Sequence, residues 1–368
     1  MSCIGSATLI DAHGFSNLVL DGDVLWVGAG YKLYKIDLNQ KIANLVYDTE
    51  GVVISFVQID GNRIFFGGNP SPNGRKSVVW SLDLGNQNIV WKHEFDINSS
   101  GGVIVTPPMV GNDMFLIGFR QTLYALDKFS GEEKWKIEKH WFGTGELLTP
   151  ILVDEQFIYG PYSMDEYGPQ TDHTVAFANP SSGEIIRTFS MPGRLGAIPA
   201  IHGNCLFIKD EIDSTHNDLR LNCIDVKSGE VIWSTGGDGY PELSHLGFYD
   251  GWVFDIFADQ LFAIDERSGT IYWKSPSLDE TIKNPQVIKE LNSVALETPD
   301  SNQIVFLDLE TGALKNEKLL SVLSSPVFIG QEAIYGTTNA IVCVDIMTGN
   351  IIWSIPVDSQ YQDVLSED

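Results

Sequence analysis

The chain has 368 residues, of which 43% are hydrophobic and 11% aromatic, and its formal net charge is −26 at pH 7. This composition supports a large packed core, whereas the acidic excess argues against nucleic-acid or anionic-membrane binding, because both need clustered Lys and Arg. No apolar run reaches the length of a membrane-spanning helix, and residues 1–30 lack the basic start and long apolar stretch of a secretion signal. We therefore expect a cytoplasmic protein.

A repeated pattern starts near residue 17 and recurs as far as residue 357. In each copy an apolar strand runs into an acid or amide, a turn follows four residues later, and a Trp usually stands at the eighth position. The acid or amide positions, in chain order, are Asp37, Asp83, Asp127, Asn179, Asp225, Asp265, Asp308 and Asp345. They are 46, 44, 52, 46, 40, 43 and 37 residues apart. A period near 40 in a strand-rich chain predicts a propeller with one blade per repeat.

The copies keep this pattern to different degrees. The residues that we assign to the structural repeat are Asp83, Asp127, Gly131, Trp135, Asp225, Gly229, Trp233, Asp265, Gly269, Trp273, Asp308, Gly312, Asp345, Gly349 and Trp353. The departures from the pattern are Lys41 and Leu45 in the first copy, Gln87 in the second, Asn179 and Arg187 in the fourth and Asn316 in the seventh. The acid can cap the turn, the Gly can take the left-handed conformation, and the Trp can pack on the next blade. These residues are expected to build the fold rather than to catalyse.

A second repeated signal precedes each motif. It is a short polar turn between two apolar strands, and most of its residues tolerate a positive φ, as tight hairpins require. The turns are Asp21-Gly22, Asp60-Gly61-Asn62, Gly111-Asn112-Asp113, Asp154-Glu155, Gly203-Asn204, Asp250-Gly251, Asn292-Ser293 and Gly330-Gln331. Each repeat therefore reads as four antiparallel strands.

These signals together predict an all-β, eight-bladed β-propeller with four antiparallel strands per blade. The blades are expected to start near residues 15, 54, 103, 148, 197, 246, 285 and 324. The chain is predicted to form a single domain over residues 1–368, with repeats over about 15–357 and a flexible acidic tail over 358–368. Residues 7–10 could add a strand to the last blade.

The connections between the second and third strands are long in the second, fourth and fifth repeats. Insertions that collect on one face of a repeat protein usually mark the working face. The insertion over residues 69–76 is mildly basic, that of the fourth repeat is acidic and aromatic, and that of the fifth repeat is acidic. With the segment after the fifth repeat, the predicted protein-binding residues are Tyr162, Asp165, Glu166, Tyr167, Asp172, Asp210, Glu211, Asp213, Asp238, Tyr240 and Glu242.

The chemistry of these loops points to a cationic protein partner. Tyr supplies contact area at low entropy cost, and carboxylates attract Lys and Arg. The alternative is that the loops are solvated and only keep the protein soluble. We expect a monomer when no partner is bound.

The repeat resembles that of the PQQ-like propeller family, whose pattern is Ala-x-Asp-x-x-Thr-Gly-x-x-x-Trp. The segments Ala125–Trp135 and Ala263–Trp273 carry it, with Ser in place of Thr. The resemblance covers most of the chain and implies the propeller fold. The family includes quinoprotein alcohol dehydrogenases and the outer-membrane assembly lipoprotein of the β-barrel machinery, so the fold leaves the function open.

Several residue patterns argue against a quinoprotein enzyme. The resemblance implies a pair of adjacent cysteines against the quinone, but the four cysteines (Cys3, Cys205, Cys223 and Cys343) are dispersed and are predicted to be reduced thiols. The stretch 213–218 has carboxylates without the spacing of a calcium loop. The seven histidines have no zinc spacing. We expect no cofactor and no metal.

The sequence thus favours a non-enzymatic protein-binding propeller. The sharpest form of this hypothesis is a cytoplasmic immunity protein that neutralises a basic toxin or nuclease domain through its acidic loop face. The alternatives are an envelope-assembly scaffold, like the outer-membrane lipoprotein, and a PQQ-dependent dehydrogenase.

Overall fold

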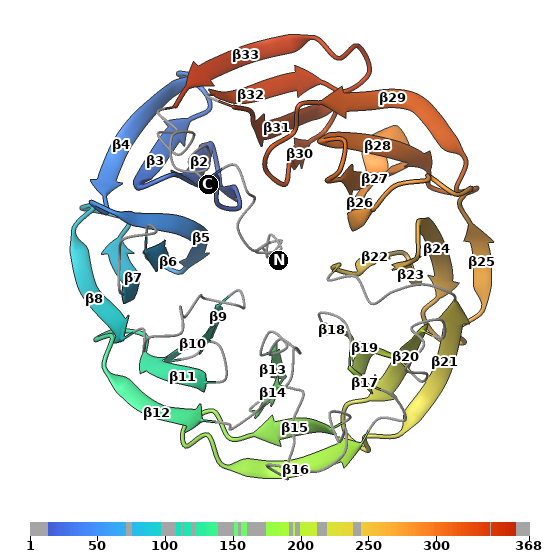
Figure 1. Ribbon diagram of the computed structural model, residues 1–368, viewed down its shortest axis with the longest axis horizontal. Helices are drawn as coiled ribbons and strands as arrows, with labels where there is room; N and C mark the ends of the chain where they lie inside the picture. Colours follow the sequence, from blue (N-terminus) through green and yellow to red (C-terminus); the bar gives the residue numbers. More distant parts are fainter. Residues whose placement is uncertain are drawn as a thin grey trace, which may run out of the picture. The chain divides into compact units, whose positions relative to one another are not determined.

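The computed structural model describes residues 14–70, 76–96, 108–111, 113–119, 122–138, 151–153, 156–159, 174–190, 194–195, 199–211, 219–237, 244–338 and 340–357 (Figure 1). Within these ranges the regular elements are β-strands, apart from the 3-10 helix η1 (Lys289–Leu291). Residues 7–10 and the tail 358–368, for which we predicted an added strand and flexibility, lie outside the described residues. The predicted all-β, eight-bladed propeller is confirmed, with one sheet for each repeat.

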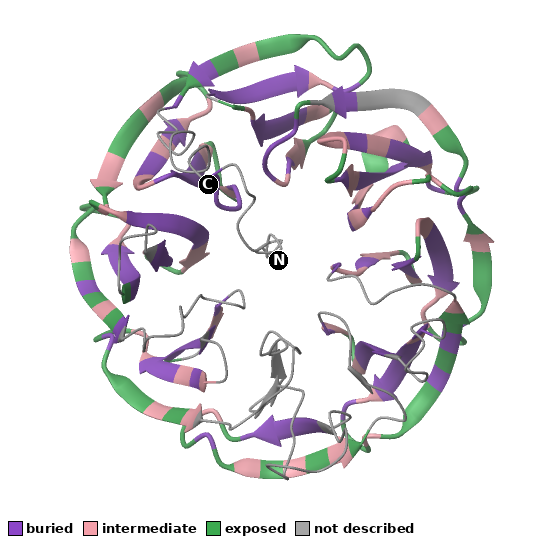
Figure 2. Ribbon diagram, viewed as in Figure 1, coloured by how far each residue is buried: buried purple, intermediate pink, exposed green. Residues whose placement is uncertain are grey.

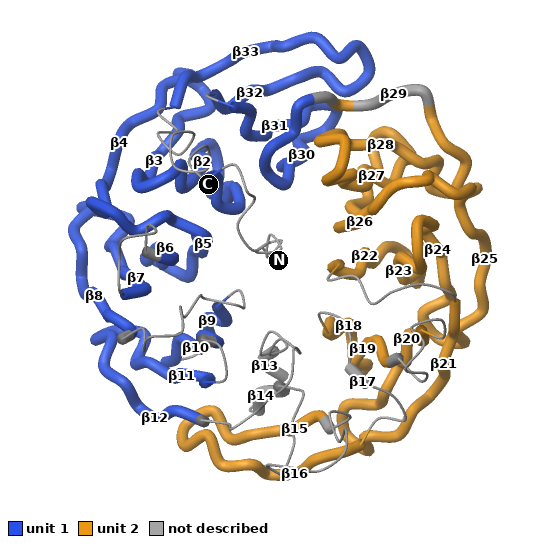
Figure 3. Tube along the Cα trace, in the orientation of Figure 1, with its two compact units in different colours: residues 1–138, 321–368 blue, residues 139–320 orange. Residues whose placement is uncertain are grey.

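The chain forms two compact units, residues 1–138 with 321–368 and residues 139–320 (Figure 3). We number the blades in chain order. The first unit holds blades 1, 2, 3 and 8. Its strands are β1 (Val19–Asp21), β2 (Val24–Ala29), β3 (Lys32–Asp37), β4 (Ile42–Asp48), β5 (Val52–Asp60), β6 (Arg63–Pro70), β7 (Lys76–Asp83), β8 (Ile89–Asp96), β9 (Met109–Gly111), β10 (Met114–Phe119), β11 (Thr122–Asp127), β12 (Glu133–Glu138), β30 (Val327–Ile329), β31 (Glu332–Gly336), β32 (Ala340–Asp345) and β33 (Ile351–Pro356).

The second unit holds blades 4 to 7. Its strands are β13 (Ile151–Val153), β14 (Gln156–Tyr159), β15 (Thr174–Ala178), β16 (Ile185–Ser190), β17 (Arg194–Leu195), β18 (Ala200–His202), β19 (Cys205–Glu211), β20 (Leu219–Asp225), β21 (Val231–Gly237), β22 (Gly247–Tyr249), β23 (Trp252–Phe257), β24 (Gln260–Asp265), β25 (Ile271–Lys274), β26 (Lys283–Ile288), β27 (Ser293–Thr298), β28 (Gln303–Asp308) and β29 (Leu314–Leu320).

Seven of the eight sheets have four strands in sequence order, as predicted, and all their pairings are antiparallel. Blade 5 differs, because its first strand is split into β17 and β18, which both pair with β19. Pro199 stands just before β18 and has no N–H to donate to the ladder, and β18 begins at Ala200.

Burial follows the position of a strand within its blade. Second and third strands are largely buried, as in β32, whereas fourth strands are largely exposed, as in β33, in which Ile355 is the buried residue (Figure 2). A fourth strand is the edge of its sheet and keeps one face in solvent. The period-two alternation of apolar and polar residues in the sequence has this origin.

The first and last repeats share one hydrophobic cluster within the first unit. Phe15, Leu25 and Val27 pack there with Ile334, Ile341 and Ile355. Gly336 lets the backbone of blade 8 approach the Phe15 ring, since a Cβ on this residue would lie 2.9 Å from Phe15 Cδ2. Blades 1 and 8 each have four strands of their own, as the sequence predicts. Within the described ranges, no helix has the length and apolar character needed to span a bilayer.

Candidate functional site

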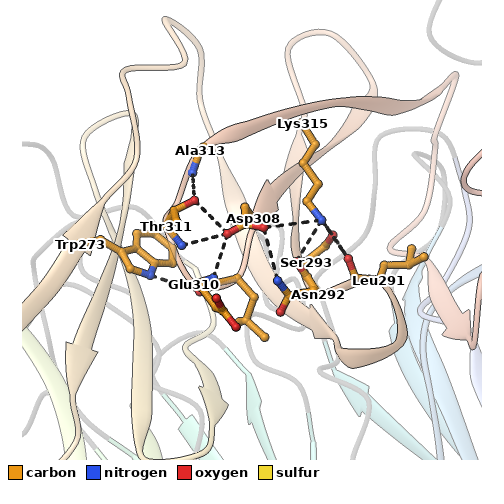
Figure 4. Close-up of polar contacts among 10 residues, drawn as sticks. Trp273, Leu291, Asn292, Ser293, Asp308, Glu310, Thr311, Ala313 and Lys315 are labelled. Atoms are coloured by element: carbon orange, nitrogen blue, oxygen red, sulfur yellow. Dashed lines mark hydrogen bonds and ion pairs between the residues drawn. The ribbon is translucent and has the colours of Figure 1, made fainter.

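The repeated acid closes its own turn, and blade 7 shows this fully (Figure 4). Asp308 Oδ1 accepts hydrogen bonds from the N–H groups of Glu310, at 3.2 Å, and Thr311, at 3.0 Å. The N–H of Gly312 donates to the carbonyl of Asp308 at 2.8 Å. Lys315 lies beside the turn, with its ammonium 4.0 Å from Asp308 Oδ2. The predicted capping role is therefore confirmed.

The same capping bonds recur in the other blades. The Oδ1 atoms of the motif residues accept N–H groups two or three residues on in every copy, namely at Asp37, Asp83, Asp127, Asn179, Asp225, Asp265 and Asp345. The fourth turn position is left-handed even where it is not Gly, as at Lys41 (φ 57°) and Gln87 (φ 60°). Even the degenerate copies thus form the same turn.

In blades 2, 5 and 6 the repeated Trp joins its blade to the next. Trp273 Nε1 donates to the carbonyl of Leu309 in the following blade at 3.2 Å, and its ring covers Gly312. Trp91 Nε1 and Trp233 Nε1 make the equivalent bonds at 3.0 Å, to Lys128 and Glu266. The Gly is therefore required for two reasons: its φ is positive, and a Cβ would collide with the Trp ring that covers it. Only the first reason is visible in the sequence.

Blade 4 replaces this Trp with Arg187. The guanidinium donates to the carbonyls of Val226 and Lys227, which stand at the positions of Leu309 and its neighbour in blade 7. Its carbon Cζ lies 4.0 Å from the ring centroid of Phe177. Arg187 therefore supplies the same donor and a comparable flat surface, so its role is structural.

The capped acids should make the fold sensitive to low pH, and Asp127 allows a clean test. Partial burial alone would raise the pKa of Asp127 from 3.8, but the N–H groups of Ser130 and Phe129 and the ammonium of Lys134 lower it to about 2. The charged form thus stabilises the folded state above pH 3.8, and this contribution is lost as the pH falls through about 2.

We expect Asp127→Asn to lower the free energy of unfolding by about 1 kcal/mol at pH 6, and to differ little from the unmodified chain near pH 2. Asn keeps the capping oxygen, as Asn179 does in blade 4, so only the charge is tested. Denaturant unfolding at both pH values measures the difference. If the two chains differ in free energy of unfolding by the same amount at pH 6 and near pH 2, the carboxylate charge is not responsible for the difference.

Most of the predicted protein-binding residues lie outside the described residues. These are Tyr162, Asp165, Glu166, Tyr167, Asp172, Asp213, Asp238, Tyr240 and Glu242. The strands that bound them are described, and they confirm the predicted topology. Residues 160–173 connect β14 to β15, and residues 212–218 connect β19 to β20, so both stretches join a second strand to a third.

Asp210 does not lie on an exposed acidic surface. It is 0% exposed, its Oδ2 accepts from Arg220 at 3.1 Å, and its Oδ1 accepts from Asn222 at 2.8 Å. Arg220 is its direct cross-strand partner on β20. Glu211 follows on the same strand, opposite Arg194. The acidic interface proposed from sequence must therefore rest on residues other than Asp210.

A second departure from the repeat, which the sequence analysis did not predict, lies at the fifth residue of the second strand. Blades 1, 2, 3 and 8 have Gly28, Gly67, Gly118 and Gly336 there. At Gly28 the first strand of blade 2 packs closely, since a Cβ would lie 2.4 Å from Ile54 Cγ2. The second unit instead has Lys209 and Glu297 in blades 5 and 7. Aligning the second strands would have revealed these two charged residues, of which Lys209 is buried and Glu297 partly buried.

Lys209 forms a fully buried ion pair with Asp255 of the next blade. The Lys209 Nζ to Asp255 Oδ1 distance is 2.8 Å, and the side chains are 2% and 1% exposed. The ammonium also donates to the Ile256 carbonyl and lies 4.8 Å from the Phe257 ring centroid. Burial raises the pKa of Asp255, and Lys209 opposes part of this rise. Asp255 Oδ2 has no hydrogen-bond partner among the described residues.

A second buried polar group lies where blades 6 and 7 meet. Asn284 donates to Glu297 Oε2 at 3.1 Å, and its own N–H donates to Ser244 Oγ at 3.0 Å. The neighbouring His245 is buried, and burial lowers its pKa to about 4, so its ring is neutral at pH 7. These groups order the start of β22 against β26. Among the described residues, no three His, Cys, Asp or Glu side chains are arranged to hold a metal ion.

Comparison with known proteins places these features in a family. The PQQ_2 family model, described as "Outer membrane protein assembly factor BamB", matches residues 75–235 and 217–366. A curated relative, tetrathionate hydrolase from Acidithiobacillus ferrooxidans, is 25% identical over 180 residues, which are 48% of this chain and 30% of that protein. The chain therefore matches less than a third of the length of this relative.

Solved structures share the fold at low sequence identity. BamB from Moraxella catarrhalis aligns with a TM-score of 0.67 and 15% identity, over 92% of this chain and 98% of that chain. The computationally designed Ika8 protein gives a TM-score of 0.64 at 15% identity, over 91% and 96%. The quinohemoprotein alcohol dehydrogenase ADHIIG from Pseudomonas putida HK5 gives 0.60 at 12%, over 87% and 69%.

Proposed function

Because the chain belongs to the PQQ_2 family described as outer membrane protein assembly factor BamB, we propose that it is a protein-binding propeller without catalytic activity. The observation that carries this proposal is the use of the repeat side chains. Each motif acid or amide caps its own turn, and Trp91, Trp233, Trp273 and Arg187 bond to the next blade. The residues that define the family pattern are thus engaged in building the fold.

The partner is a basic protein. The formal net charge of −26 gives the chain a field that attracts cations. The connections between β14 and β15 and between β19 and β20 add carboxylates to this field, with Tyr side chains in the first of them. Carboxylates that pair with Arg or Lys at a protein interface can contribute several kcal/mol of coupling energy.

In its most specific form, the proposal is a cytoplasmic immunity protein that neutralises a basic toxin or nuclease domain. Such a protein has to bind quickly at low concentration, which electrostatic steering favours. It needs no cofactor and no reaction of its own. A basic active site that is covered by an acidic surface cannot reach its nucleic-acid substrate.

Association kinetics provide the test. The partner is captured from the source organism on the immobilised full chain, and its association rate is then measured across ionic strength. A charge-loss variant replaces four acidic residues by Ser: Asp165, Glu166, Asp172 and Asp213. We expect its association rate to fall about tenfold at low salt, and the two rates to converge near 1 M salt, where the Debye length is about 3 Å.

A matched control keeps the change in net charge but moves it elsewhere. It replaces four exposed acidic residues by Ser: Glu50, Glu132, Glu230 and Glu290. This control is expected to lose little of the association rate. Equal losses in both variants would mean that only the net charge matters, and no loss in either would remove electrostatic steering from the mechanism.

The family description favours a second candidate, an envelope-assembly scaffold. It shares protein binding with the first proposal but differs in where the protein acts. Fractionation of the source organism separates the two: recovery with the membranes supports assembly, and recovery in the cytoplasm supports the immunity role.

A further inference from the structure

Two cysteines meet across adjacent strands of blade 5. Cys205 begins β19 and pairs in register with Asp225, while Cys223 stands two residues before Asp225 on β20. This diagonal relation puts both side chains on the same face of the sheet. Cys223 belongs to the hydrophobic cluster around Phe207, and Cys205 packs against that cluster.

Blade 8 shows that side chains in these positions touch. Glu332 and Cys343 occupy the places of Cys205 and Cys223, since Glu332 pairs with Asp345 and Cys343 stands two residues before it. Cys343 Sγ lies 3.3 Å from Glu332 Oε2. In blade 8 the longer Glu side chain thus reaches the thiol across the same diagonal.

The two thiols of blade 5 differ in access. Cys205 is half-buried and Cys223 is fully buried. Burial raises the pKa of the Cys223 thiol, and the contact with Cys205 raises it further. Cys223 is therefore a protonated thiol at neutral pH, held against a partner that solvent can reach. Both are free thiols in the structure.

We propose that Cys205 and Cys223 form a reversible disulfide when the protein meets a peroxide. In the first step Cys205 Sγ attacks one peroxide oxygen, the O–O bond breaks, and Cys205 becomes a sulfenic acid as one water leaves. In the second step Cys223 Sγ attacks Cys205 Sγ, the S–S bond forms, and the S–O bond breaks. The hydroxide takes the Cys223 proton and leaves as a second water. The two thiols supply the two electrons that reduce the peroxide.

The disulfide would join β19 and β20 near the capped turn of Asp225. Segment 206–222 would then become a closed loop with fewer unfolded conformations, so the oxidised chain should resist unfolding better than the reduced chain. This site is independent of the proposed partner, and its test requires none.

The test uses the full chain with Cys3→Ser, which leaves the three cysteines that the structure describes. After treatment with hydrogen peroxide, the denatured chain is alkylated and its peptides are analysed by mass spectrometry. We expect the alkylated thiols to fall from three to one, with a peptide cross-linked through Cys205 and Cys223, and dithiothreitol should restore all three. Three persisting thiols, or a sulfinic acid at Cys205 without a cross-link, would overturn the proposal.

Two further variants give matched controls. Cys223→Ser should stop at a sulfenic acid on Cys205, which a dimedone probe detects. Glu332→Cys rebuilds the same diagonal pair in blade 8, and it should form a second disulfide with Cys343. If Glu332→Cys cross-links but the native pair does not, the geometry permits a disulfide and the surroundings of Cys205 prevent it, which would also contradict the proposal.

Discussion

Replacing Asp255 by Ala is expected to lower the free energy of unfolding by about 4 kcal/mol, because it leaves a buried ammonium without its counter-ion. Lys209 is 2% exposed and would keep only the Ile256 carbonyl and the face of Phe257. Chemical denaturation followed by circular dichroism measures the loss. A loss below about 1 kcal/mol, the size found for surface pairs, would show that water or a proton change compensates for the missing charge.

Two variants separate burial from charge pairing. Lys128 and Asp60 form an ion pair at 2.6 Å, and the Asp60 side chain is 37% exposed. Asp60→Ala removes the counter-ion of this pair and should lower the free energy of unfolding by about 0.5 kcal/mol. Lys209→Met combined with Asp255→Leu removes both buried charges at once. This double variant should recover most of the stability lost by Asp255→Ala, since well-packed apolar residues often replace a buried pair without loss.

The second large effect is expected at Gly312. Ala at this position would place its Cβ 2.3 Å from Cε3 of Trp273, in a backbone with φ of +70°. The left-handed conformation costs Ala about 1 kcal/mol, and displacing a packed ring costs about 2 kcal/mol more. We expect Gly312→Ala to lower the free energy of unfolding by about 3 kcal/mol in total.

Gly349 is the matched control, because it has nearly the same φ, +69°, and no atom lies within 4 Å of its ideal Cβ position. Gly349→Ala should therefore cost only the conformational part, about 1 kcal/mol. A double-mutant cycle completes the test, since Gly312→Ala should cost no more than Gly349→Ala once Trp273 is Leu. Equal costs for both Gly variants in the unmodified chain would contradict the ring contact.

The sequence predicts the architecture well because the turn chemistry is local. An acid that caps N–H groups two and three residues away needs no distant partner, so the motif is visible in the sequence wherever it folds. Lys41 and Gln87 illustrate the strength of this signal: both take the left-handed position without being Gly, since the rest of the turn is retained. The split of β17 and β18 was not predicted, although Pro199 was visible.

The candidate site was less predictable because its residues depend on partners across strands and blades. Asp210 stands in a polar run and was interpreted as a loop residue, but β19 extends through Glu211 and carries Asp210 opposite Arg220. Lys209 pairs with Asp255 of the next blade, and its ammonium also donates to the carbonyl of Ile256, which lies 47 positions further along the chain. No local pattern reveals such a pair. Only the comparison of equivalent positions in the eight repeats marks Lys209 as unusual.

The cluster that Phe15 and Leu25 share with Ile341 and Ile355 has a consequence for protein synthesis. At about 5–20 residues per second, a ribosome needs roughly 15–60 seconds to make the residues between Leu25 and Ile341. During that interval the residues of the first repeat in this cluster lack their partners in the last repeat, although other residues of the first repeat can already pack on blade 2. We therefore expect the earliest segment of the nascent chain to expose apolar side chains until the last repeat is made.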